Sequence, residues 1–84
     1  MKKIILSEHA KEQCAFRGTN ENEVREAIET CPWSPAEHSR LECSKEFAYN
    51  TEWNRKVYKT KKVRPIFADK EHEIEVVTVY TYYF

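Results

Sequence analysis

The chain has 84 residues, of which 33% are charged and 40% hydrophobic, and its formal net charge is zero. This length predicts a single domain, residues 1–84, because a second core would have too few residues to bury. The longest apolar run covers only residues 4–6, which argues against a membrane span or a secretory signal and favours a cytoplasmic protein.

Two helices are predicted in the amino-terminal half. Ser7 is a candidate N-cap of the first helix, because its hydroxyl can accept a backbone N–H two or three residues later. Gly18 is expected to end this helix in the left-handed conformation that glycine adopts without strain. The second helix is expected to begin after Asn20 and to end before Pro32. Its apolar stripe follows the spacing i, i+3, i+4, i+7 and consists of Val24, Ala27, Ile28 and Cys31.

The hydrophobic period changes from 3.6 to 2 after the second helix, which predicts strands. One strand is expected over residues 41–49, followed by a turn at 50–54. Residues 55–60 and 62–68 are expected to form two short strands or one bent strand, because Pro65 cannot donate to a sheet ladder.

The strongest β signal lies in residues 73–83, where β-branched and aromatic residues dominate. Strict alternation would divide the side chains of this strand between two faces. One face would carry Ile74, Val76, Thr78, Tyr80 and Tyr82, and the other Val77, Val79, Thr81 and Tyr83. Together, the elements predict an α+β fold with two N-terminal helices packed on one face of an antiparallel sheet of three or four strands. The opposite, open face is the expected place of a site.

Six of the chain's cations fall within residues 55–64, a stretch without acidic residues. Such a basic stripe can attract a polyanion even in a protein without net charge, because salt screens the more distant charges. The sequence therefore predicts RNA binding by five of these residues, which are Arg55, Lys56, Lys59, Lys61 and Lys62. The alternative is a solvated edge strand on which lysines prevent aggregation.

Several classes of site are not expected. A single glycine provides no glycine-rich loop to hold a phosphate. The histidines and cysteines have none of the spacings of a zinc site. The carboxylates of residues 53–84 gather at one turn, residues 69–75, which does not suit a two-metal nuclease. We therefore expect no metal and no cofactor, and we interpret the cysteines as small buried residues.

The remaining side chains suit RNA cleavage through the 2′-hydroxyl. This reaction needs an acid and a base for two proton transfers, and cations that hold the phosphate. We expect His9 to act as the general acid or base and Arg17 and Arg64 to bind the phosphate. Tyr80 would stack on a base or donate a proton. The alternatives are a surface histidine, an arginine that complements the helix dipole and a core tyrosine.

The hypothesis of an RNA-cleaving site requires a particular packing of the chain. The first helix must lie against the last strands, so that the imidazole of His9 and the guanidinium of Arg64 face one groove.

The opening stretch SEHAKEQCAFRG and the closing VVTVY form one ordered pattern, carried by Ser7, His9, Ala10, Arg17, Gly18, Val77, Thr78, Val79 and Tyr80. This pattern resembles a family of small, mostly bacterial domains of unknown function, over nearly the whole chain. The sequence departs from the family at Gln13, where an arginine is usual, and this removes a cation from the expected site. The family is distantly similar to the RelE/ParE and BrnT toxins. The resemblance implies a small α+β ribonuclease or inhibitor encoded beside an antitoxin.

Three functions follow as hypotheses. The first is a RelE-like, toxin-type domain that cleaves or binds RNA without a metal and has an antitoxin protein as its partner. The second is a non-catalytic protein-binding module that uses the acidic helix face or the basic stripe. The third is a plain nucleic-acid binder, whose RNA affinity would depend steeply on salt. The oligomeric state, the RNA sequence and any dependence on the ribosome stay open.

Overall fold

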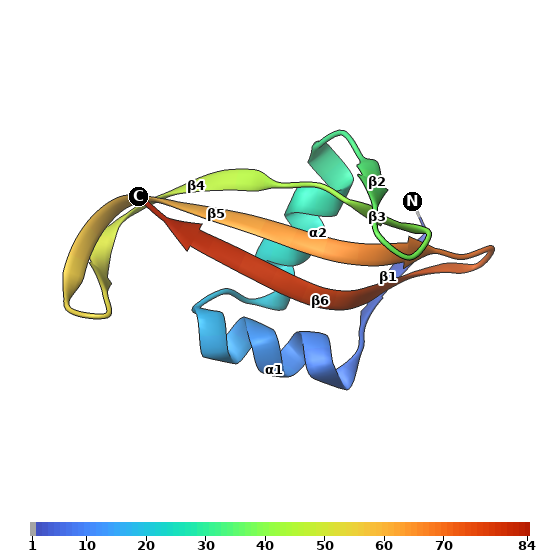
Figure 1. Ribbon diagram of the computed structural model, residues 1–84, viewed down its shortest axis with the longest axis horizontal. Helices are drawn as coiled ribbons and strands as arrows, with labels where there is room; N and C mark the ends of the chain where they lie inside the picture. Colours follow the sequence, from blue (N-terminus) through green and yellow to red (C-terminus); the bar gives the residue numbers. More distant parts are fainter. Residues whose placement is uncertain (1) are drawn as a thin grey trace.

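The computed structural model describes residues 2–84 as an α+β fold in which two helices accompany one mixed sheet (Figure 1). The elements in chain order are β1 (Lys3–Leu6), α1 (Glu8–Arg17), α2 (Glu21–Thr30), β2 (Ser34–Ala36), β3 (Arg40–Glu42), β4 (Lys45–Trp53), β5 (Lys56–Asp69) and β6 (Glu73–Tyr83). Both expected helices are confirmed. Within the described residues, neither helix has the length and apolar composition needed to cross a membrane.

The sheet has six strands in the described part of the chain, in the order β1-β6-β5-β3-β2, and β4 also pairs with β5. β1 runs parallel to β6, whereas the other pairs are antiparallel. The expected antiparallel sheet of three or four strands is therefore wrong, although the α+β class holds. Strands β1 and β2, of four and three residues, were not predicted, and the one strand expected over residues 41–49 is divided into β3 and β4. Segments as short as β1 and β2 show no alternation, and they become strands by pairing with β6 and β3.

The long central strand β5 runs without a break for 14 residues, which is the one-strand alternative of the two expected from the sequence. Pro65 lies inside it, opposite Val79 of β6. On the other edge of β5, pairing with β3 ends at Ile66, and pairing with β4 begins at Val63. Pro65 falls in the interval between these two partners. Its missing N–H therefore interrupts neither of their ladders.

The predicted helix ends are confirmed by their capping bonds. The Ser7 hydroxyl accepts the backbone N–H of Ala10 at 3.1 Å, and the Asn20 side chain accepts that of Glu23 at 2.9 Å. Gly18 ends α1 with φ +78°, where a side chain would be strained. These caps depend on residues close together in the sequence, which is why the sequence predicts them.

Helix α1 lies along β6, beyond the point where β1 ends (Figure 1). At its start, the backbone N–H of Ser7 donates to the carbonyl of Val76 at 3.0 Å. At its end, the hydroxyls of Thr81 and Tyr83 both donate to the carbonyl of Arg17, at 2.9 and 2.5 Å. Both ends of α1 are thus attached to β6, which fixes the side chains of this helix relative to the strand.

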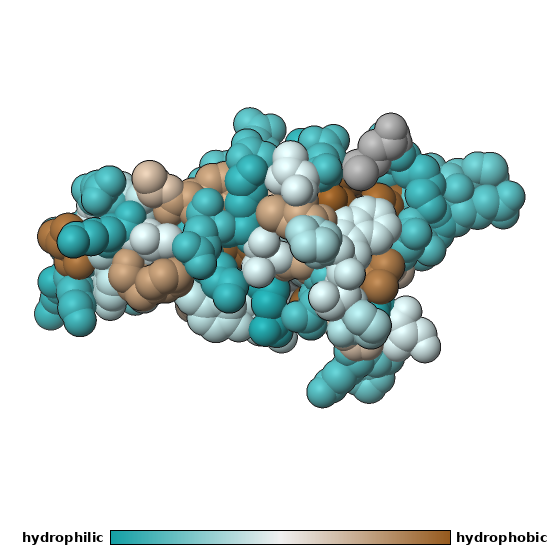
Figure 2. All heavy atoms as spheres, turned by 90° about the horizontal axis from the view of Figure 1, so that it is seen from above, coloured by the Kyte–Doolittle hydropathy of each residue, from teal (hydrophilic) through white to brown (hydrophobic). Residues whose placement is uncertain are grey.

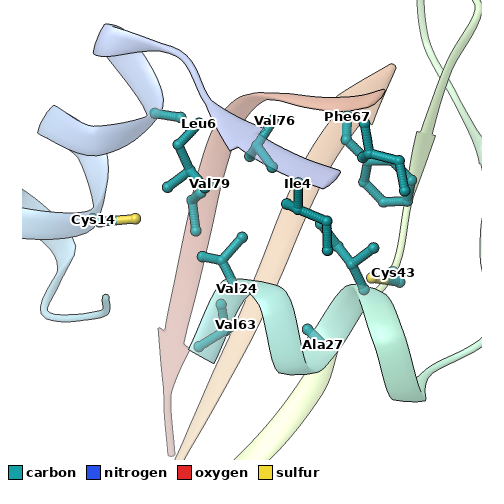
Figure 3. Packing of buried hydrophobic residues seen from close by; sticks show 13 residues of the cluster. Ile4, Leu6, Cys14, Val24, Ala27, Cys43, Val63, Phe67, Val76 and Val79 are labelled. Carbon is teal, nitrogen blue, oxygen red and sulfur yellow. The ribbon is translucent and has the colours of Figure 1, made fainter. Parts of the chain in front are cut away.

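The hydrophobic core fills the space between the helices and one face of the sheet (Figure 3). α2 contributes Val24, Ala27 and Ile28 to it, and α1 contributes Ala10 and Cys14, all of which are buried. The sheet contributes mainly Val63, Phe67, Ile74, Val76 and Val79. Two of the three cysteines are buried as expected, and all three are free thiols.

A β-bulge in β6 corrects the faces expected for this strand. Val76 pairs with Phe67 and Thr78 pairs with Ile66, so Val77 is an extra residue without a partner of its own. The alternation is shifted by one position after it. The core side consequently carries Ile74 and Val76 before the bulge and Val79 after it, all fully buried. The open side carries Thr78, Tyr80 and Tyr82, opposite Ile66, Arg64 and Lys62 of β5.

Candidate functional site

The centre of the candidate site is Tyr80, whose ring lies against two arginines. The guanidinium carbon of Arg64 is 5.0 Å from the ring centroid, and that of Arg17 is 5.2 Å away. Arg64 faces Tyr80 across the β5–β6 pair, whereas Arg17 reaches it from the last turn of α1. Each contact has the geometry of a cation–π interaction. Two positive charges from different elements therefore meet on one aromatic ring.

Arg64 has an incomplete set of partners. Its Nε is buried and makes no hydrogen bond, the only such side-chain atom in the part of the chain described here. The nearest carboxylate oxygen, Oε1 of Glu42, is 4.0 Å from this Nε, at the outer limit of an ion pair. A buried donor without an acceptor costs about 1–3 kcal/mol. This unmet donor makes Arg64 a candidate for binding a ligand.

Arg17 is held in place by Gln13. The Nε of Arg17 donates to Oε1 of Gln13 at 2.7 Å, one helical turn earlier. The sequence suggested that Gln13 weakens the site, because it replaces a cation of the resembled family. In the structure, the amide restrains the guanidinium that remains, so Gln13 is a positioning residue for Arg17.

His9 lies beside the same strand face, at the start of α1. Its Nε2 is 3.2 Å from the hydroxyl of Thr78, the residue two positions before Tyr80 on the open face. The side chain is otherwise exposed. The structure thus brings His9 and Arg17 from α1 and Arg64 from β5 to consecutive open-face positions of β6, with the predicted residue Tyr80 among them.

A cavity of about 310 Å³ adjoins this group. Arg64 and Ile66 of β5 line one part of it, and Val77, Thr78 and Tyr80 of β6 line another. The β2–β3 hairpin supplies the third wall, through Ala36, Glu37, His38, Arg40 and Glu42. His38 and Arg40 were not predicted as site residues. They are brought here by the β2–β3 hairpin, because β3 pairs with β5, and no local sequence pattern predicts this pairing.

The cations of the basic stripe, residues 55–64, lie in different parts of the structure. Arg55 lies in the turn between β4 and β5, and Lys56 and Lys59 are exposed on the arm that these strands form. Figure 2 shows mostly hydrophilic side chains around this arm, with a hydrophobic spot at its tip, where Val57 is 69% exposed. Lys62 lies opposite Tyr82, next to Arg64 on the open face.

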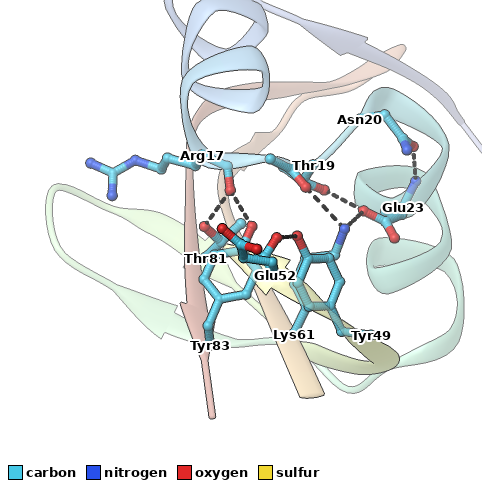
Figure 4. Close-up of polar contacts among 10 residues, drawn as sticks. Arg17, Thr19, Asn20, Glu23, Tyr49, Glu52, Lys61, Thr81 and Tyr83 are labelled. Atoms are coloured by element: carbon cyan, nitrogen blue, oxygen red, sulfur yellow. Dashed lines mark hydrogen bonds and ion pairs between the residues drawn. The ribbon is translucent and has the colours of Figure 1, made fainter. Parts of the chain in front are cut away.

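Lys61 differs from the other residues of the stripe. It is only 6% exposed, and its Nζ is 2.7 Å from a carboxylate oxygen of Glu23 on α2. The same Nζ donates to the carbonyl of Gly18 at 3.0 Å. Figure 4 shows this contact beside the carbonyl of Arg17, whose side chain extends away from the cluster. Lys61 is therefore bound to Glu23 and Gly18 on the core side and does not belong to the open face.

Comparisons of the chain with protein-family models, with curated proteins and with solved structures find no match. Among residues 2–84, no group of three or more histidine, cysteine or acidic side chains is placed to hold a metal ion.

Proposed function

We propose that the open face of the sheet binds single-stranded RNA. The observation that carries this proposal is the meeting of Arg17 and Arg64 on the ring of Tyr80, with the Arg64 Nε unpaired. A guanidinium presents a planar set of donors that suits the oxygens of a phosphate. An aromatic ring beside it offers a surface on which an unpaired base can stack.

The residues around this centre extend the same chemistry along the strands. Tyr82 is 43% exposed, and its ring lies 5.9 Å from the guanidinium carbon of Arg64. Lys62 faces Tyr82 from β5, so cations and aromatic rings alternate on this face. Alternating positive charge and stacking surfaces suit a single strand, whose bases are unpaired. The exposed cations of the β4–β5 arm would attract the phosphate backbone of the RNA without recognising the base sequence.

The proposal is tested by the affinity for a fluorescently labelled single-stranded RNA, measured by anisotropy. Arg64→Met should weaken binding by about tenfold or more, because a charge-assisted phosphate contact contributes about 1.5–3 kcal/mol. The slope of log K against log salt should also become shallower by about 0.7, as expected for one lost phosphate contact on a single strand.

The matched control is Arg25→Met. Arg25 lies on α2, on the covered side of the sheet, and pairs with Glu21 at 3.5 Å. Its replacement removes the same charge from the protein and should leave RNA affinity unchanged. Equal losses in the two variants, or no RNA binding by the unmodified protein, would refute the proposal.

The toxin-type role stays part of this proposal as its biological setting. The resemblance of the motif residues implies an antitoxin that would occupy or distort the open face. If so, a small open reading frame beside this one should encode a protein that competes with labelled RNA. If this partner binds Arg64→Met as tightly as it binds the unmodified protein, its binding site lies elsewhere on the molecule.

A further inference from the structure

The cavity beside Arg64 carries charges of both signs. Arg40 and Glu42 line it from β3, and Glu37 adds a second carboxylate from the β2–β3 hairpin. Because carboxylates repel a phosphate, the interior of this cavity suits a phosphate poorly. Its volume of about 310 Å³ lies in the range of small-molecule sites. The mixed lining suits an uncharged group that has both hydrogen-bond donors and hydrogen-bond acceptors.

Strand β3 presents Arg40 and Glu42 on the same face. Leu41, which lies between them, packs against the hydrophobic core, and neighbouring side chains of a strand point to opposite faces. Glu42 also pairs with Ile66, a residue of the open face. Arg40 and Glu42 are therefore both on the open side, about 7 Å apart along the strand. A cationic donor and an anionic acceptor thus form one wall of the cavity.

The turn before this wall is tight. His38 and Ser39 both have φ +60°, and the backbone N–H of Arg40 donates to the carbonyl of Glu37 at 3.3 Å. Positive φ at both central residues is typical of hairpin turns whose twist matches that of their strands. The turn therefore helps to fix the direction in which β3 presents Arg40 and Glu42.

The carboxylate of Glu42 is accessible to a ligand. The side chain of Glu42 is 31% exposed, and its contact with the Nε of Arg64, at 4.0 Å, is longer than a hydrogen bond. On its other side, the guanidinium of Arg64 lies over the ring of Tyr80. A nucleotide whose phosphate contacts Arg64 can therefore place its base against β3, while a neighbouring base stacks on Tyr80.

We propose that this cavity binds the base of an unpaired guanosine. The inference rests on the RNA binding proposed above and names the nucleotide that the open face prefers. Guanine has two neighbouring donors, N1–H and the N2 amino group, which the two oxygens of a carboxylate accept together. It also has two neighbouring acceptors, O6 and N7, which suit the fork of an arginine. Glu42 accepts from the donors, and Arg40 donates to the acceptors.

The other three bases match this pair of side chains less well. Adenine has an amino group between two acceptor nitrogens, and uracil has one ring donor between two carbonyl oxygens. Cytosine has an amino group beside an acceptor nitrogen, which a carboxylate oxygen would repel. None of them gives both oxygens of a carboxylate a donor from the base-pairing edge. Because an unmet polar group costs affinity, Glu42 discriminates in favour of guanine.

The test compares short labelled oligouridines that differ in one central nucleotide, with anisotropy as the readout. The unmodified protein should bind the guanosine oligomer about tenfold more tightly than the adenosine oligomer, as expected for a bidentate base contact. Inosine, which lacks the N2 amino group, should lose most of this gain. 7-Deazaguanosine, which lacks N7, should lose a part of it through Arg40. These comparisons need no variant of the protein.

Glu42→Gln removes the charge and keeps the size of the side chain. It should reduce the preference for guanosine to about threefold or less, without weakening the adenosine oligomer. A purely structural role of Glu42 would instead weaken both oligomers together. Glu37→Gln serves as the control, because it removes the same charge from the same cavity but its side chain is 94% exposed. This variant should change both affinities alike and keep the preference.

The possible outcomes separate the two proposals. Binding of all the oligomers with equal affinity, or a preference for another base, would overturn the guanine inference and leave RNA binding in place. A full preference retained by Glu42→Gln, or an equal loss in Glu37→Gln, would overturn the role of Glu42. Absence of binding to every oligomer would overturn the proposed function itself.

Discussion

The two faces of β5 treat their cations in opposite ways. Lys61 lies on the core side, where a carboxylate, a carbonyl and the ring of Tyr49 surround its charge. Arg64 lies three residues later on the open side, where its Nε has no acceptor and its nearest carboxylate is 4.0 Å away. Both belong to one basic stripe in the sequence. The position of a cation within a charged stretch of sequence therefore does not show whether it stabilises the fold or is free to bind a ligand. Its contacts in the structure show this.

The core-side arrangement has a clear structural purpose. Glu23 accepts from the Thr19 hydroxyl at 2.8 Å as well as pairing with Lys61. Lys61 also bonds to Gly18, so the connection between α1 and α2 is fastened to β5 (Figure 4). Burial strengthens these interactions because little water competes for the charges. The same connection holds Arg17 near Tyr80, and the core side thereby supports the open side.

The largest expected effect is that of Lys61→Met. Removing one partner of a buried ion pair leaves Glu23 without its cation, and we expect a loss of about 3 kcal/mol in the free energy of unfolding. Urea denaturation measures this loss. The matched change Lys62→Met, on the open face, should alter stability by less than about 0.5 kcal/mol. Similar losses in both variants would contradict the division between the two faces.

A second prediction concerns Cys43, whose thiol is buried in the hydrophobic core. Burial, with smaller contributions from Cys31 and Glu42, raises the pKa of the Cys43 thiol to about 12. An unfolded thiol titrates near pH 8.5, so the unfolded state loses its proton first as the pH rises. This group therefore stabilises the fold fully below about pH 8.5, and its contribution is lost as the pH rises toward 12.

At pH 9.5, about 1.4 kcal/mol of the free energy of unfolding should be lost through this thiol relative to neutral pH. The measurement is a series of urea denaturation curves from pH 7 to 10. Cys43→Ala lowers stability at every pH, but its curve should fall less steeply above pH 8.5. A slope equal to that of the unmodified protein would show that Cys43 is not protected from ionisation.

The smallest effect distinguishes two neighbouring tyrosines of β6. Tyr83 donates to the carbonyl of Arg17, and burial raises the pKa of its phenol, which keeps it a donor. Tyr83→Phe should therefore cost about 1 kcal/mol, the usual net value of a hydrogen bond. Tyr82→Phe should leave stability unchanged, because Tyr82 is exposed on the other face. Thermal unfolding measures the melting temperatures of the two variants. An equal shift in both melting temperatures would argue against the assigned faces.

Features fixed by neighbouring residues could be predicted from the sequence. Ser7, Asn20 and Gly18 mark the helix ends because their capping bonds span only three or four residues. The apolar stripe of α2 likewise follows from its own spacing. Strand β2 and the division of residues 41–49 between β3 and β4 could not be predicted, because a three-residue strand shows no alternation of its own and acquires its conformation from its partner.

The candidate site was predictable to a similar extent. Arg17, Arg64 and Tyr80 could be named because their side chains suit RNA chemistry, and the structure places them together. His38 could not be predicted as a site residue, because only the pairing of β3 with β5 brings its hairpin to the cavity. The burial of Lys61 was equally hidden, since its partner Glu23 lies 38 positions earlier, among acidic residues of α2 to which the sequence alone assigns no partner.

The bulge at Val77 means that the open face depends on the pairing of β6 as well as on its composition. If Val77 took a regular place in the ladder, the same sequence would turn Tyr80 inward and Tyr83 outward. The aromatic ring would then leave its two guanidinium groups, although no side chain had been substituted. Relatives of this protein should therefore be compared by the pairing register of this strand before asking which residues they share.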